Sequence, residues 1–197
     1  RFTLLPNTTL FRSAILLDVD KLPAQTVPEM FEQVVAKFGD KPALSTILPT
    51  GAETSVTYRE LQSHAEDFAR YLREDLGLGA SDTVAIMAPN CIAFCVASLG
   101  IAMAGCVGTN VNPLYTPSEL EHQLNDSKAK AIVIIDLFGD KLDEVVANTG
   151  VQHVVTLSVV DFFPTLKKAL LGFVLKRVRK GIPTMNTPHT KLTAALA

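Results

Sequence analysis

The sequence has little net charge and few cysteines. Its formal net charge is −2 over 197 residues, too small for a nucleic-acid binder that depends on its overall electrostatic field. Glycine and proline, 11 of each, stay within ordinary proportions, which excludes collagen-like and low-complexity classes. With 48% hydrophobic residues the chain is too apolar for a disordered tail. These values predict a folded globular domain.

Only three cysteines are present, Cys91, Cys95 and Cys106. No histidine or further cysteine stands at a spacing typical of zinc ligands, so the sequence predicts no metal site. An odd number of cysteines inside an apolar stretch favours small buried side chains in a reducing compartment over disulfides. Because no secretory signal is visible, we expect a cytoplasmic protein.

The longest stretch without a charged side chain runs from Thr83 to Ser118. Pro89 and Pro113 interrupt it, and the longest helix that it can hold, residues 91–104, is shorter than the about 20 residues that span a bilayer. We therefore expect this stretch to form buried core.

Charge is unevenly distributed along the chain. Residues 1–160 carry 11 Lys/Arg against 19 Asp/Glu, whereas residues 161–197 carry 7 against 1. An acidic body followed by a basic segment predicts that the segment meets something anionic. A membrane surface, a nucleic acid and an acidic patch of the same protein all remain open at this point.

Capping signals and apolar runs divide the chain into alternating helices and strands. Thr26, Thr57 and Thr116 are each followed three residues later by glutamate, the pattern of a capping box that opens a helix. A further helix is expected from Cys91, with Asn90 as its cap, and another around residues 142–146. Strands are predicted at residues 43–47, 55–57, 83–88, 106–111, 130–136 and 153–158. This order predicts an α/β fold with an incomplete doubly wound, mostly parallel sheet and flanking helices.

Ligands of an open α/β sheet usually lie beyond the carboxyl ends of its strands. The polar residues there are Asn90, Asn110, Asn112 and Asp136. We favour roles as helix caps or as side chains that order their own loops. No G-x-x-x-x-G-K-[ST] loop, no G-x-G-x-x-G turn after a strand and no G-x-S-x-G elbow occurs. The residues alone therefore predict no catalytic, cofactor-binding or metal-binding residue.

Three segments carry a resemblance to a known family. The stretch at residues 77–133, GLGASDTVAIMAPNCIAFCVASLGIAMAGCVGTNVNPLYTPSELEHQLNDSKAKAIV, resembles the amino-terminal part of adenylate-forming acyl-CoA synthetases. DKPAL at residues 40–44 and VTYREL at residues 56–61 fit the same family in the same order. NVNPLYTPSELEHQLNDS, residues 110–127, is similar in detail to bacterial long-chain fatty-acid–CoA ligases.

The resemblance implies a parent enzyme that joins a fatty acid to ATP, releases pyrophosphate and passes the acyl group from acyl-AMP to CoA. ATP, Mg²⁺ and CoA are the cofactors it implies, and the missing remainder of the polypeptide is a partner. The family's phosphate loop, adenine motif, ribose-binding aspartate and C-terminal lysine have no matching positions here. We therefore expect this chain to be an N-terminal fragment that binds no cofactor and is inactive alone.

Four regions follow from these observations. Residues 1–13 are an extension, which foreign sequence could supply, and residues 25–160 are the α/β portion of an AMP-binding large domain. Residues 161–181 are a basic amphipathic segment and residues 182–197 a truncated tail.

The basic segment is expected to lie on an anionic membrane surface, which makes the protein peripherally membrane-associated. At helical spacing its apolar side chains fall on one broad arc; Lys168, Lys176 and Arg179 lie opposite, whereas Lys167 and Arg177 fall within the arc. The predicted membrane-binding residues are Phe162, Phe163, Leu166, Lys167, Lys168, Leu170, Phe173, Lys176, Arg177, Arg179 and Lys180. Two alternatives stay open: a core-packing helix, and a non-catalytic α/β domain that docks on a membrane or partner protein through this segment.

Overall fold

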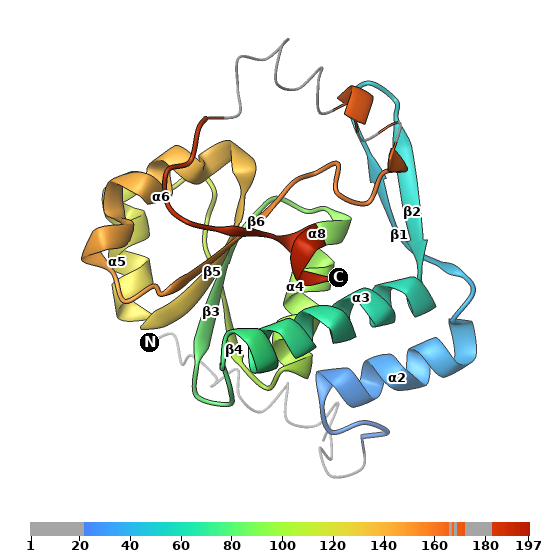
Figure 1. The fold of residues 1–197 in the computed structure, drawn as a ribbon. Coiled ribbons are helices and arrows are strands. Elements are labelled where there is room, and N and C mark those ends of the chain that lie inside the picture. Colours follow the sequence, from blue (N-terminus) through green and yellow to red (C-terminus); the bar gives the residue numbers. More distant parts are fainter. Residues whose placement is uncertain (1–21, 166, 168, 172–182) are drawn as a thin grey trace, which may run out of the picture.

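The structure, a computed structural model, describes residues 22–165, 167, 169–171 and 183–197 (Figure 1). A five-stranded parallel sheet forms its centre, with strand order β4-β3-β5-β6-β7. The strands are β3 (Thr83–Met87), β4 (Val107–Asn110), β5 (Ala129–Ile135), β6 (His153–Leu157) and β7 (Thr190–Lys191). The first four confirm the predicted strands to within one or two residues.

Helices cover both faces of this sheet (Figure 1). On one face lie α3 (Tyr58–Arg70) and α4 (Ile92–Met103), and on the other α5 (Pro117–Asp126) and α6 (Gly139–Val145). Successive strand residues alternate between two core clusters, since Val84 faces α3 and α4 while Ala85 faces α5 and α6. The predicted doubly wound α/β arrangement is confirmed.

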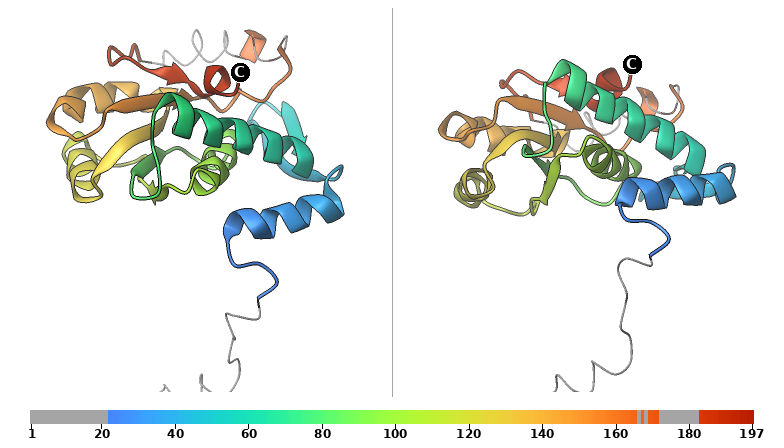
Figure 2. Two further views of the ribbon diagram at one scale, coloured as in Figure 1. Left: turned by 60° about the horizontal axis from the view of Figure 1, so that its bottom comes forward. Right: turned by 90° about the horizontal axis from the view of Figure 1, so that it is seen from below.

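A third core cluster lies to one side of the sheet, where α2 and a hairpin pack on α3 and α4 (Figure 2). The helix α2 spans Val27–Phe38, and the antiparallel hairpin is formed by β1 (Pro42–Ile47) and β2 (Glu53–Thr57). The inner face of the hairpin supplies Leu44 and Val56 to this cluster.

The helix starts follow the predicted capping signals with two exceptions. Complete capping boxes are formed by Thr57 with Glu60 and by Thr116 with Glu119. At α2, Thr26 accepts its bond from the Glu29 amide, but the Glu29 carboxylate accepts from the backbone of Gln25 rather than from Thr26. The cap of α4 is Cys91, with no side-chain bond, so the prediction of Asn90 as cap is wrong.

Helical backbone continues beyond the regular helices in short turns. A π-helical turn, Tyr71–Asp75, extends α3, and the chain then leaves the helix at Gly77, whose φ of +66° favours glycine. Short 3₁₀ turns at Asp136–Phe138 and Val146–Asn148 flank α6.

Residues 183–197 differ from the tail that the sequence analysis assigned to them. In the structure they add β7 to the sheet edge and form the short helix α8 (Leu192–Ala195), and the Leu192 side chain is fully buried. A two-residue strand has no periodicity to detect, which is why its pattern is invisible in the sequence.

The uncharged stretch from Thr83 to Ser118 folds into β3, α4, β4 and the start of α5. As expected, β3 and much of α4 are buried core, but the edge strand β4 is largely exposed, with Val107 50% exposed. Across the described part of the chain, every helix is too short or too polar to cross a bilayer.

Candidate functional site

The polar residues at the carboxyl edge of the sheet serve the local backbone. Asn112 accepts a hydrogen bond from the Leu114 amide at 3.0 Å through its side-chain Oδ1 atom. The side-chain Nε2 atom of Gln123 donates a hydrogen bond to the backbone carbonyl of Asn110 at 2.8 Å, which ties the loop to α5. Asn90 is exposed beside the start of α4, and Asp136 begins the 3₁₀ turn after β5. The expectation that Asn112 orders its own loop is confirmed.

A metal site is absent from the parts of the chain that the structure describes, where no three His, Cys, Asp or Glu side chains are gathered. The histidines remain dispersed over separate elements. His64, on α3, places its ring 5.1 Å from the ring of Phe162.

The start of the basic segment is held by the protein itself. Asp161 accepts a hydrogen bond from the Ser158 amide at 2.7 Å, and Thr54 of β2 donates to the Phe162 carbonyl at 2.9 Å. Phe163 is 4% exposed, and Phe162 is half-buried against two of the core clusters. These two side chains, which the sequence assigned to a membrane-facing arc, therefore pack on the protein.

Two other residues of the predicted membrane surface are open to solvent. Leu170 is 65% exposed, and Lys167 is exposed as well. The remaining predicted residues lie outside those that the structure describes: Leu166, Lys168, Phe173, Lys176, Arg177, Arg179 and Lys180.

A carboxylate on α6 anchors the chain where it returns to the sheet. The two oxygens of Asp143 accept hydrogen bonds from the backbone and side chain of both Asn186 and Thr187, at 2.5 to 3.1 Å. Burial by itself would raise the pKa of Asp143, but these four hydrogen bonds outweigh it and hold the pKa below its ordinary value of 3.8. The sequence did not single out this residue, because its partners lie more than 40 residues away.

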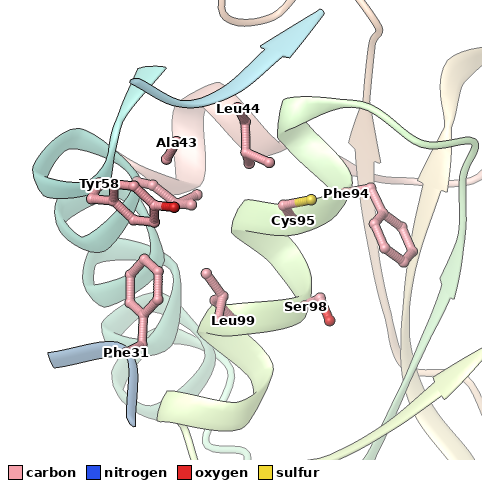
Figure 3. A pocket seen from close by; sticks show the side chains of 9 residues that line it. Phe31, Ala43, Leu44, Tyr58, Phe94, Cys95, Ser98 and Leu99 are labelled. Carbon is pink, nitrogen blue, oxygen red and sulfur yellow. The ribbon is translucent and has the colours of Figure 1, made fainter. Parts of the chain in front are cut away.

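An apolar groove opens between α2, β1, α3 and α4 (Figure 3). Its volume is about 310 Å³, at the lower end of the usual range for small-molecule sites. The large apolar side chains that line it are Phe31, Leu44, Tyr58, Leu61, Phe94 and Leu99. Sequence reasoning missed the groove, since its wall is assembled from four elements and no single one shows it.

Cys95 also lines this groove, and burial raises the pKa of its thiol. Burial likewise raises the pKa of Cys91 and of Cys106. All three thiols are free, as the sequence predicted.

Two basic side chains lie over a ring that packs beside the wall of the groove. The Nζ atoms of Lys37 and Lys41 lie 5.2 and 5.0 Å from the centre of the Phe38 ring. That ring is 6.5 Å from the ring of Tyr58, which lines the groove.

Comparisons with known proteins agree with this architecture. The profile of the family described as AMP-binding enzyme matches residues 31–194. Over 164 residues the chain is 44% identical to a long-chain-fatty-acid–CoA ligase of Escherichia coli O157:H7, a match that covers 83% of this chain and 28% of that relative. The chain thus spans less than a third of the length of this curated relative.

Solved structures show the same fold. A putative long-chain-fatty-acid CoA ligase from Rhodopseudomonas palustris CGA009 superposes with a TM-score of 0.64 at 20% identity, covering 87% of this chain and 36% of that one. The A-PCP didomain of a carboxylic acid reductase from Segniliparus rugosus gives a TM-score of 0.66 at 15% identity, covering 89% and 27%. Identities this low show the fold alone, whereas the profile match spans most of the sequence. The chain therefore belongs to the family of AMP-binding enzymes.

Proposed function

We propose that the chain is the N-terminal part of an ATP-dependent, AMP-forming ligase that converts long-chain fatty acids into acyl-CoA through acyl-AMP. The observation that carries this proposal is the 44% identity over 164 residues to a relative of that name. In the longer protein, the capped helices and the parallel sheet of this part form one rigid side of the substrate site.

We propose that the residues of this chain do not by themselves hold ATP with Mg²⁺. Magnesium takes several oxygen ligands in near-octahedral geometry. The one buried side-chain atom without a hydrogen-bond partner, among the residues that the structure describes, is Gln123 Oε1, and a single amide oxygen does not hold this ion. We propose that ATP, Mg²⁺ and CoA are bound by residues outside this chain.

Pyrophosphate release tests the proposal. The 197-residue chain is expected to release none above a no-protein control when given ATP, Mg²⁺ and palmitate, because it lacks a loop that stabilises the charge of a triphosphate. The full-length protein that contains this sequence is expected to release pyrophosphate and to form palmitoyl-CoA when CoA is added. Turnover by the chain alone would contradict its inactivity, and a full-length protein inert toward long-chain acids would overturn the ligase assignment.

We further propose that the basic segment docks peripherally on an anionic membrane. Lys167 and Leu170 are exposed and stand three residues apart, which places them on neighbouring parts of one helix surface. A long-chain acid partitions into the bilayer, so a ligase for such acids gains substrate by lying there. Each basic residue near an anionic surface contributes about 1 kcal/mol.

Vesicle co-sedimentation at low and high salt tests this docking. Replacing Lys167, Lys168, Lys176, Arg177, Arg179 and Lys180 by glutamine is expected to abolish binding to phosphatidylglycerol vesicles. The control variant Arg70→Gln/Lys128→Gln, which removes exposed positive charge from the body, should bind as the unchanged chain does. Equal binding to neutral and anionic vesicles would contradict an electrostatic mechanism.

A further inference from the structure

The groove between α2, β1, α3 and α4 has the properties of a site for an aliphatic chain. Its wall is almost entirely apolar: Phe31 and Leu61 form the buried base, and Leu44, Tyr58 and Leu99 are half-buried around it. In Figure 3 the side chains of Phe31, Leu44, Tyr58 and Leu99 lie around one space, and Cys95 on α4 also lines the groove. Removing apolar surface from water is favourable by about 25 cal/mol per Å², so this wall favours an apolar ligand.

The charge near the groove is positive at one end. Tyr58 forms part of the wall, the Phe38 ring packs on it, and the ammonium groups of Lys37 and Lys41 lie over that same ring. The nearby carboxylate of Asp40 is already bound by Arg59 at 3.1 Å. An apolar groove next to two ammonium groups is complementary to a molecule that is apolar along its length and anionic at its head.

We propose that this groove binds a free long-chain carboxylate, with its aliphatic tail against Leu44, Tyr58 and Leu99 and its carboxylate beside Lys37 and Lys41. The ligand matches the substrate class of the proposed function, but the site lies in the part of the protein that carries no catalytic motif. In this proposal the groove is a second, non-catalytic site that holds the acid before it is activated elsewhere in the longer protein.

The cysteines provide a built-in test. Cys95 lines the groove, while Cys106 lies just before β4, away from the residues that line it, and both are half-buried. Palmitate, kept below its critical micelle concentration, is expected to slow the alkylation of Cys95 by N-ethylmaleimide. The extent of alkylation at each cysteine is measured over time by peptide mass spectrometry. At a free concentration ten times the Kd the rate should fall about tenfold by mass action, while that of Cys106 stays unchanged.

Matched variants separate the apolar wall from the charged end. Leu44→Asp places a charge in the groove and should remove the protection of Cys95, whereas Leu114→Asp, at a leucine that is 83% exposed, should retain it. Lys37→Gln/Lys41→Gln should weaken palmitate binding roughly three- to tenfold, as expected for two exposed ion pairs. The same double variant should bind methyl palmitate, which has no charge, as the unchanged chain does.

Each contrary result overturns the proposal. Equal protection of Cys95 and Cys106, or no protection at saturating palmitate, would exclude a bound acid at this place. Protection by phosphatidylglycerol vesicles without free acid would mean that the groove faces a lipid surface instead. Should Leu44→Asp fail to fold, palmitate binding by the Lys37→Gln/Lys41→Gln variant still tests the proposal. Both lysines are exposed, so their replacement leaves the core intact. The protection assay contains no ATP, so a negative result would not contradict the proposed ligase activity, which pyrophosphate release tests separately.

Discussion

Replacing Phe68 by alanine is expected to lower the free energy of unfolding by about 3–5 kcal/mol. Phe68 lies on α3 with none of its surface exposed, in the largest core cluster. Its ring packs directly on the backbone of α4, because a Cβ atom added to Gly100 would lie only 2.8 Å from it. Gly100 itself has no side chain that could move into the cavity left by the ring.

Urea unfolding followed by circular dichroism measures this change. Leu114→Ala is the matched control: its side chain is 83% exposed, and surface substitutions stay within about 0.5 kcal/mol. Phe68→Leu keeps part of the volume and should fall between the two. If Phe68→Ala unfolds within 1 kcal/mol of the unchanged chain, the α3–α4 contact is not the centre of the core.

Removing the Asp143 carboxylate is expected to lower the free energy of unfolding by about 2–3 kcal/mol at pH 7. The substitution Asp143→Ala takes away an acceptor of four hydrogen bonds and leaves the Asn186 and Thr187 amides without their partner. Hydrogen bonds to a charged group are worth about 1.5–3 kcal/mol each, and the partial exposure of this site reduces their sum. The loss should loosen β7 and α8, which follow directly in the chain.

The pH dependence of this effect has a defined sign. Because the folded chain holds the pKa of Asp143 below 3.8, its unfolded form takes up a proton first as the pH falls. The stabilisation is therefore fully present above pH 3.8 and is lost as the pH falls through the lower folded value. We expect the gap in unfolding free energy between the unchanged chain and Asp143→Ala to be equal at pH 7 and pH 5 and to narrow below pH 3.8.

The neighbouring variant Glu144→Ala removes the same charge from an exposed position on α6 and is the control. It should leave the unfolding free energy within about 0.5 kcal/mol of the unchanged chain at each pH. An equal loss from both variants would attribute the effect to net charge rather than to the four hydrogen bonds.

Local patterns were enough to predict most of the secondary structure. The capping boxes at Thr57 and Thr116 depend on residues three positions apart, and the apolar runs of β3 and β5 are continuous in the sequence. The same locality explains the error at Asn90. Which of two adjacent residues caps α4 depends on how the chain leaves β3, and composition does not contain that information.

Sequence patterns predicted little of the candidate site beyond the role of its loop residues. The Asn112 side chain orders its own loop, as predicted, whereas the Asn110 hydrogen bond joins its backbone carbonyl to the Gln123 side chain on α5. The basic segment was read as one continuous amphipathic arc. In the structure Phe162 instead contacts β2 and α3, through contacts that join residues up to 108 positions apart, and Phe163 is buried.

The sequence by itself determined the capped starts of α3 and α5, the buried strands, the α/β class and the family resemblance, since each of these depends on neighbouring residues or on a contiguous motif. Only the tertiary structure decided that residues 183–197 return to the sheet edge, that Asp143 anchors them, and that α2, β1, α3 and α4 enclose a groove. The physical reason is that hydrogen-bonded caps and helical or strand periodicity act over a few residues, whereas strand order, anchoring contacts and cavities come from packing between distant segments.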